Sequence, residues 1–116
     1  MAVTTFAAID IGSYEVSMKI FEISKRIGFR EINDVRYQLE LGRGTYAAGR
    51  LEMETVDELC EILNDFKRMM AEFGVESWRA CATSSLRELE NPVIILEQIY
   101  QRTGIRVEIL SNAEQH

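Results

Sequence analysis

The chain has 116 residues, and its 13 basic and 19 acidic side chains give it a formal net charge of −6. With 47% hydrophobic and 28% charged residues, the composition is that of one folded globular domain and excludes a disordered or low-complexity segment. The acidic balance argues against nonspecific binding to nucleic acid or to a membrane surface, because phosphate backbones and anionic lipids attract basic faces.

Three strands are predicted in the first part of the chain. Residues 4–11 are rich in apolar and β-favouring side chains, and the Asp-Ile-Gly-Ser sequence at 10–13 is typical of a turn. Apolar and polar residues then alternate over 16–21 and again over 35–41, which indicates two further strands. A turn at 25–28 separates these two strands, so all three are expected to form an antiparallel meander.

After a glycine-rich connection at 42–49 the period of the apolar residues changes. Apolar side chains recur every three or four positions over 56–73, which predicts one amphipathic helix. A short strand is expected at 78–82, a second helix with an Asn-Pro start at 91–104, and a last strand at 105–110. The order is β-β-β-α-β-α-β, an α/β fold whose alternating units add parallel strands through right-handed crossovers.

Small polar turns follow three of these strands, at 10–13, 83–85 and 111–114. Ligands of open α/β sheets bind beyond the carboxyl ends of the strands, so these turns form the candidate site. In the first turn, backbone amides and the Ser13 hydroxyl can cradle a phosphate group. Asp10 can hold Mg²⁺ directly or through water, because this ion needs only one or two carboxylates when phosphate oxygens complete its shell.

The second and third turns add further polar groups. The hydroxyls of Thr83, Ser84 and Ser85 can donate to phosphate oxygens, and the guanidinium of Arg87 can bind such oxygens with two donors. Glu114 can act as a general base on water. Ordinary roles stay open for all three turns: a β-turn for the first, a capped helix start for the second, and a solvated carboxylate for Glu114.

The sequence carries no sign of export, of a membrane span or of a zinc site. No stretch approaches the roughly 18–20 apolar residues that cross a bilayer, and the segment before Asp10 is too short for the core of a signal peptide. Cys60 and Cys81 lie far apart, and the chain has a single histidine, which argues against zinc. Free thiols fit a reducing compartment, so we expect a cytoplasmic protein.

Four motifs together resemble a known family. They are Ala-Ala-Ile-Asp-Ile-Gly-Ser at 7–13, Gly-Arg-Leu at 49–51, Ala-Thr-Ser-Ser-Leu-Arg-Glu at 82–88 and Ile-Leu-Ser-Asn-Ala-Glu at 109–114. The series is similar to that of the exopolyphosphatase and guanosine pentaphosphate phosphohydrolase (Ppx/GppA) family, within the superfamily of actin, heat-shock chaperones and sugar kinases. The first motif is shared across the superfamily, and the third is more specific to the family.

The resemblance implies both a fold and an activity. The fold would be a ribonuclease-H-like mixed sheet of the actin-like ATPase kind, in which residues 1–116 form the N-terminal part of the first lobe. This single domain would be truncated before its closing helix, and an unfinished sheet exposes apolar surface, so self-association is expected. The full-length protein would release terminal phosphate from inorganic polyphosphate, or the 5′ phosphate of guanosine pentaphosphate, with Mg²⁺ as cofactor. The chain by itself is expected to be inactive.

The resemblance also implies roles for particular residues. Asp10 would be the metal ligand, and Glu114 would be the base that activates the attacking water. The phosphate-binding residues would be Gly12, Ser13, Thr83, Ser84, Ser85 and Arg87. This sequence departs from the family at Tyr14 and Glu15, where the family usually has asparagine and serine, and Glu15 brings negative charge toward a polyanion. A noncatalytic sensor of phosphate or nucleotide on the same fold is therefore the alternative. Neither nucleic acid nor a membrane is expected as a partner.

Overall fold

The computed structural model describes residues 3–41, 53–83, 86, 89 and 91–110. Its elements follow in the order β1 (Thr4–Ile11), β2 (Glu15–Ser24), β3 (Gly28–Gln38), α2 (Met53–Phe73), β4 (Ser77–Ala82), α4 (Pro92–Thr103) and β5 (Val107–Ile109). The predicted α/β fold with the order β-β-β-α-β-α-β is confirmed. Neither helix among the described residues combines the length and the apolar character needed to cross a membrane.

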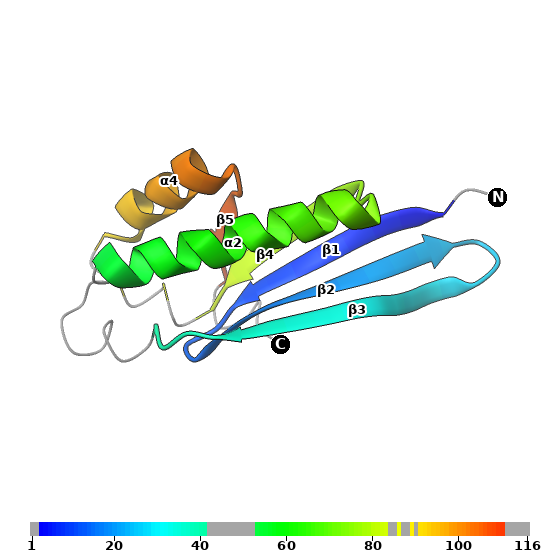
Figure 1. Cartoon of the computed structure of the whole chain (residues 1–116), viewed down its shortest axis with the longest axis horizontal. Coiled ribbons are helices and arrows are strands. Elements are labelled where there is room, and N and C mark those ends of the chain that lie inside the picture. The colour runs from blue at the N-terminus through cyan, green and yellow to red at the C-terminus, as the bar shows by residue number, and fades with distance from the viewer. Residues whose placement is uncertain (1–2, 42–52, 84–85, 87–88, 90, 111–116) are drawn as a thin grey trace.

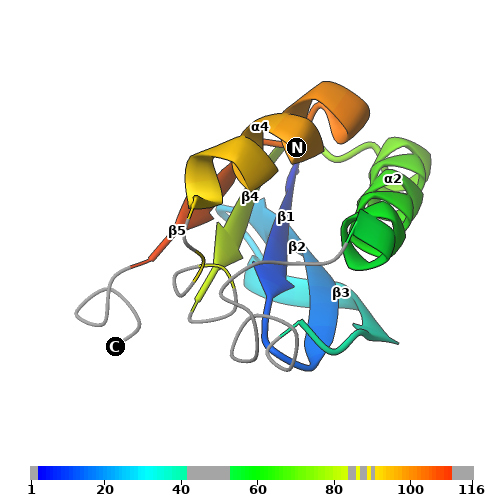
Figure 2. The ribbon, with the colours of Figure 1, turned by 90° about the vertical axis from the view of Figure 1, so that its left-hand side faces the viewer.

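The five strands form one mixed sheet in the order β3-β2-β1-β4-β5 (Figure 1). The first three strands pair antiparallel, as the predicted meander requires, and β4 and β5 are added parallel to β1. Both helices lie on the same face of this sheet (Figure 2). Because β1, β4 and β5 run in one direction, their carboxyl ends meet at one edge of the sheet.

The face of the sheet that meets the helices is apolar. Alternate residues of β1 and β2 are buried there, and one stripe of α2 covers them, so the predicted periods of strand and helix are both confirmed. The buried side chains of this layer are Ala7, Ile9, Ile11, Val16, Met18, Ile20, Val56, Leu59, Cys60, Leu63, Phe66 and Met70. Cys60 and Cys81 form no disulfide with each other.

Four strands differ in length from the sequence prediction. β4 begins one residue earlier than expected, at Ser77. β2 covers Glu15–Ser24 where 16–21 was expected, and β3 covers Gly28–Gln38 where 35–41 was expected. The register of this pair shifts at Ile32, where a β-bulge interrupts the alternation of side chains. The residues before the bulge are exposed on both faces of the strand, so the first part of β3 shows no clear period of two. β5 is shorter than predicted.

Helix α4 begins and ends near the predicted positions. Pro92 takes the first helical position, and Gly104 ends the helix with a positive φ of 74°, a conformation that glycine adopts without strain. The Gly104 amide donates to the carbonyl of Tyr100 at 2.8 Å. Asn91, in contrast, makes no side-chain capping hydrogen bond, because its backbone (φ −133°, ψ 71°) does not have the geometry of a cap.

Thr103 is a buried polar side chain at the end of α4. Its Oγ1 donates to the carbonyl of Ile99 at 2.7 Å and accepts from the amide of Ile105 at 3.0 Å. We predict that Thr103→Val lowers the free energy of unfolding by about 1–3 kcal/mol, because a buried N–H loses its acceptor. Thr103→Ser keeps the hydroxyl and should lose less. Urea denaturation measures both, and equal losses would show that the hydroxyl does not stabilise this helix end.

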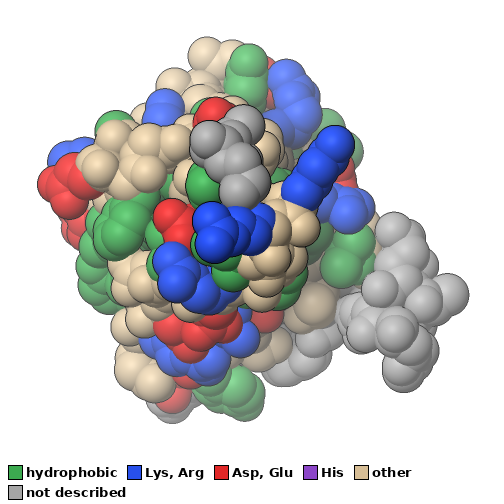
Figure 3. Space-filling view, turned by 90° about the vertical axis from the view of Figure 1, so that its right-hand side faces the viewer, with side chains coloured by type: hydrophobic (Ala, Val, Ile, Leu, Met, Phe, Trp, Pro, Cys, Tyr) green, Lys and Arg blue, Asp and Glu red, His purple; other side chains and the backbone are tan. Residues whose placement is uncertain are grey.

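The opposite face of the sheet, here called the open face, carries no helix in the described part of the chain (Figure 2). Phe21 and Phe29 stack on it with ring centroids 4.6 Å apart, and Phe29 is 65% exposed. Seen from the end that holds the β2–β3 hairpin, hydrophobic side chains are interspersed with charged ones (Figure 3). The expected self-association stays a prediction, which light scattering would measure.

Candidate functional site

Backbone hydrogen bonds close the turn between β1 and β2. The amide of Gly12 donates to the carbonyl of Glu15 at 2.9 Å, and the amide of Leu41 donates to the carbonyl of Ser13 at 2.7 Å. A Cβ atom at position 12 would lie 3.1 Å from the Glu15 carbonyl oxygen, so glycine permits this close approach of backbone to backbone. Since the Gly12 amide is already engaged, its contribution in this conformation is to the shape of the turn.

Thr83 lies at the same edge of the sheet as this turn. In the parallel pair of β1 and β4, Ile11 is opposite Ala82, and Thr83 is the next residue along the chain. The chain that leaves β5 runs beside them, because the amide of Leu110 donates to the carbonyl of Ala82 at 2.9 Å. The arrowheads of β1 and β4 accordingly point to one edge (Figure 2). The structure thus brings the first predicted turn and the start of the second together.

The remaining predicted site residues lie outside the described part of the chain. They are Ser84, Ser85, Arg87 and Glu114. The geometry of the candidate site therefore rests on Asp10, Gly12, Ser13 and Thr83.

Asp10, the metal ligand predicted from the sequence, lies at this edge of the sheet. Its neighbours Ile9 and Ile11 are buried under the helices, so the Asp10 side chain lies on the open face. Partial burial raises the pKa of the Asp10 carboxyl, and the negative charge of Glu15 raises it further. A partly desolvated carboxylate with an acidic neighbour favours a bound cation.

A magnesium ion fits this position on the chemistry of its donors. Among the described residues, no three His, Cys, Asp or Glu side chains gather to hold a metal by themselves. Mg²⁺ does not need such a cage, because it is often held by one or two carboxylates together with water and phosphate oxygens. Asp10 can supply that carboxylate, and a phosphate bound at the turn can supply the oxygens.

The electrostatic coupling of Glu15 to Asp10 leads to a prediction. Glu15→Gln should lower the pKa of the Asp10 carboxyl toward its ordinary value, because one of the two causes of the rise is removed. Carboxyl chemical shifts followed by NMR during a pH titration measure this pKa. Glu22→Gln on the same strand is the control and should leave the pKa of the Asp10 carboxyl unchanged. An unchanged Asp10 pKa in the Glu15 variant would contradict the coupling.

Sequence reasoning missed Arg36, which the fold places next to this site. Its Nη1 donates to Glu15 Oε1 at 2.8 Å. Asp10 is opposite Ser17 in the β1–β2 pair, and Ser17 is opposite Arg36 in the β2–β3 pair, so the three form a row across the sheet. No local spacing indicates this row, because its members come from three strands and meet only when the strands pair.

Hollows lined by residues that the structure describes also lie outside the turn. The first, of about 370 Å³, lies between the end of β3 and the start of α2 and is lined by Gln38, Leu39, Glu40, Thr55 and Glu58. Its two carboxylates would repel a polyanion, so it does not suit a phosphate chain.

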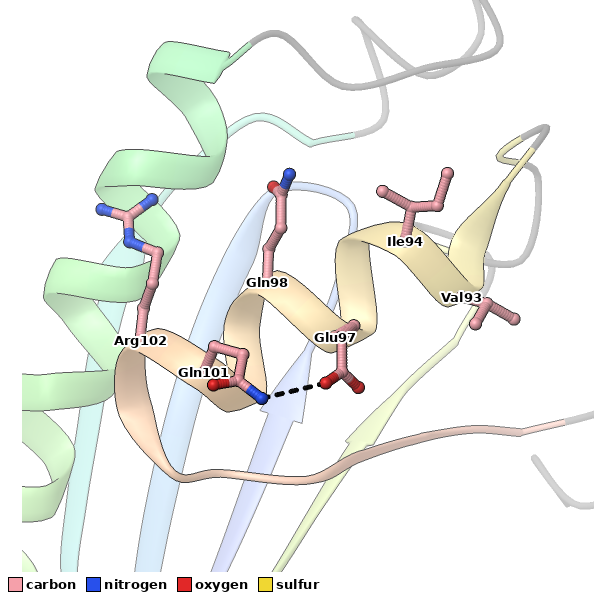
Figure 4. Close-up of a pocket in the computed structure, with 6 residues that line it drawn as sticks. All are labelled: Val93, Ile94, Glu97, Gln98, Gln101 and Arg102. Carbon is pink, nitrogen blue, oxygen red and sulfur yellow. Dashed lines mark hydrogen bonds between the residues drawn. The ribbon is translucent and has the colours of Figure 1, made fainter.

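The second hollow, of about 460 Å³, runs along α4 and is lined by Val93, Ile94, Glu97, Gln98, Gln101 and Arg102 (Figure 4). The amide nitrogen of Gln101 donates to the Glu97 carboxylate at 3.0 Å. Arg102 extends toward α2, where its Nη1 donates to Asp57 Oδ1 at 2.7 Å. These charged groups are engaged in structural contacts, so we place the site at the strand ends.

Comparison with known proteins gives a consistent result. Residues 20–115 match the Ppx/GppA phosphatase family. This match includes the second and third polar turns and begins after the first. Exopolyphosphatase 2 of Mycobacterium tuberculosis is 30% identical over 94 residues, which cover 78% of this chain and 30% of that protein. Exopolyphosphatase 1 of Mycobacterium leprae is 22% identical over 107 residues, which cover 92% of this chain and 32% of that protein.

The fold is also found among solved structures. The crystal structure of the Ppx/GppA family member from Aquifex aeolicus superposes with a TM-score of 0.89 at 31% identity, over 96% of this chain and 36% of that one. The ribonuclease-H-like, actin-like mixed sheet is thereby confirmed. The chain spans about a third of the length of the relatives it matches.

Proposed function

Because the chain belongs to the Ppx/GppA phosphatase family, we propose that it contributes one side of the active site of a phosphoanhydride hydrolase. The whole protein would release terminal phosphate from inorganic polyphosphate or the 5′ phosphate of guanosine pentaphosphate. The observation that carries this proposal is the meeting of the first polar turn with Thr83 at the carboxyl edge of the parallel strands, beside Asp10. Polyphosphate is supported by the relatives that are named exopolyphosphatases.

The residues at this edge have complementary roles in the proposal. Asp10 would hold Mg²⁺ directly or through water, and the ion would neutralise charge on the phosphate oxygens. The hydroxyls of Ser13 and Thr83 would donate to the phosphate chain, while Gly12 keeps the turn narrow. Further donors would come from Ser84, Ser85 and Arg87. Hydroxyl and guanidinium donors suit a polyanion because they supply hydrogen bonds without adding negative charge.

The proposed reaction is an in-line displacement at the terminal phosphorus. A water oxygen forms the new bond to phosphorus as the bond from phosphorus to the bridging oxygen breaks. The water proton passes to the Glu114 carboxylate, and the chain leaves with its bridging oxygen as the new terminal phosphate oxygen. Positioning and charge stabilisation supply most of the acceleration in such transfers.

Phosphate release by the whole protein tests this function. With polyphosphate and Mg²⁺, we expect release by the wild type and a loss of roughly 100-fold or more for Glu114→Gln, since a general base contributes on that order. Equal rates in both proteins would exclude Glu114 as the base. The 116-residue chain alone should release no phosphate, because it spans about a third of its relatives.

A noncatalytic sensor on the same fold is the second candidate. It is favoured by the turn itself, where Tyr14 is 61% exposed and Glu15 follows it. A sensor would bind polyphosphate or guanosine pentaphosphate without releasing phosphate from it. Binding measured by calorimetry together with no release by the whole protein would therefore support the sensor over the hydrolase.

A further inference from the structure

An ion-pair network lies on the open face of the sheet beside the first turn. Arg36 donates from Nη1 to Glu15 Oε1 at 2.8 Å, from Nε to Asp34 Oδ1 at 3.1 Å and from Nη2 to Asp34 Oδ2 at 3.2 Å. One guanidinium on β3 thus holds a carboxylate on its own strand and another on β2. The network begins at the residue that departs from the family pattern, Glu15.

The network adjoins the Asp10 carboxylate. Ser17 is opposite Asp10 on one side and opposite Arg36 on the other. Glu15 lies two residues before Ser17 on β2 and therefore on the same face of the sheet. Glu15 is therefore the diagonal neighbour of Asp10 across the β1–β2 pair, close enough for its charge to act on that carboxylate.

Glu15 has opposite effects on the two ligands of the proposed site. A negative charge beside Asp10 attracts Mg²⁺ and repels a phosphate chain. The Arg36 guanidinium opposes both effects while it is paired with Glu15. The side chains of this pair are 52% and 36% exposed, and such hydrated pairs add little to folding stability. We therefore expect the Arg36–Glu15 pair to change the net charge beside Asp10 more than it changes the stability of the fold.

On the premise of the proposed function, we propose that Arg36 is a positioning residue that neutralises Glu15 beside Asp10, so that the site accepts a phosphate chain together with Mg²⁺. Arg36 acts here through Glu15 and makes no contact with the substrate. It also holds the Glu15 carboxylate toward β3, which would keep Glu15 from becoming a second ligand of Mg²⁺ beside Asp10. In this proposal, the pairing of Glu15 with Arg36 allows the site to bind a polyanion although Glu15 stands where the family usually has serine.

The test uses two probes on the 116-residue chain, Mg²⁺ alone and magnesium tripolyphosphate, each titrated by calorimetry. Arg36→Met should bind Mg²⁺ roughly three- to tenfold more tightly and magnesium tripolyphosphate more weakly by a similar factor, the size of effect that one unit charge exerts at a hydrated surface. Changes in opposite directions separate this role from a structural one, since a damaged fold would weaken both. Arg30→Met is the matched control, because Arg30 pairs with Glu22 on the same hairpin at 2.7 Å.

The double variant Glu15→Gln with Arg36→Met decides whether Arg36 acts through Glu15. Both affinities should return close to those of Glu15→Gln alone. If tripolyphosphate binding stays weak in the double variant, Arg36 contacts the phosphate itself and the inference is wrong. If the wild type binds both probes and Arg36→Met changes neither affinity, the inference fails while the proposed function stands. If the wild-type chain binds neither probe, the inference fails, while phosphate release by the whole protein still decides the proposed function.

Discussion

Replacing Asp10 with asparagine is expected to reduce Mg²⁺-dependent phosphate release by the whole protein by roughly 100-fold or more, since a catalytic metal supplies several kcal/mol of charge stabilisation. Asp10 lies at the carboxyl edge of β1, directly before the turn that would hold the phosphate. Asparagine keeps the size of the side chain and removes the negative charge that would hold Mg²⁺ in the proposed site. Phosphate release, measured with increasing Mg²⁺, checks the prediction.

The same variant should fold as well as the wild type or better. The pKa of Asp10 is raised in the folded chain, so the fold disfavours its charged form. This unfavourable contribution is present above the raised pKa and disappears as the pH falls below the ordinary range of a carboxyl. Urea denaturation at neutral pH should therefore show no loss of stability for Asp10→Asn.

Glu31→Gln is the control for the Asp10 variant. Glu31 lies farther along the open face, in an exposed pair with Lys19 at 3.6 Å, and its replacement should leave the rate unchanged. Full activity in Asp10→Asn at every Mg²⁺ concentration would remove Asp10 from the metal site.

Phe66→Ala is expected to lower the free energy of unfolding by about 3–5 kcal/mol, the range for large aromatic residues removed from a core. Phe66 is fully buried on the stripe of α2 that packs against the sheet. Its ring lies 5.6 Å from the ring of Tyr37 on β3, centroid to centroid. The substitution therefore opens a cavity between the helix and the antiparallel part of the sheet.

Phe73→Ala is the matched control for this substitution. It removes the same atoms from the same helix, yet Phe73 is 42% exposed at the last helical position. We expect a loss well below that of Phe66→Ala, since little cavity forms at the surface. Thermal and urea denaturation measure both variants. Equal losses would show that the packing of α2 on the sheet is not the main source of stability in this region.

Local patterns predicted the elements of this fold well where one side of the element is buried. The alternation of Val16, Met18 and Ile20 and the helical stripe of α2 each report a buried face directly, because burial selects apolar side chains at the period of the backbone. The first part of β3 was not predicted, since its residues before the bulge at Ile32 are exposed and no buried face selects apolar side chains there. The boundary at Gly104 was predictable, because few residues other than glycine adopt its positive φ.

The candidate site was predictable only in part. Asp10, Gly12, Ser13 and Thr83 were indicated by polar residues at strand ends, and the parallel pairing of β1 with β4 brings the first turn and Thr83 to one edge. Glu15 was identified as a repulsive charge, but the Arg36 partner that opposes it was not. The two residues lie on different strands, and no local period relates them.

By itself, the sequence determined the types and order of the elements and the chemistry of the turns, because these depend on neighbouring residues along the chain. The tertiary structure alone decided which side chains share a row across the sheet, as Asp10, Ser17 and Arg36 do. Such a row depends on the register of three strands, and a shift by one residue would turn each side chain to the other face. The register is set by packing the whole apolar face against α2 and α4, so the charge balance at Asp10 follows from the assembled fold.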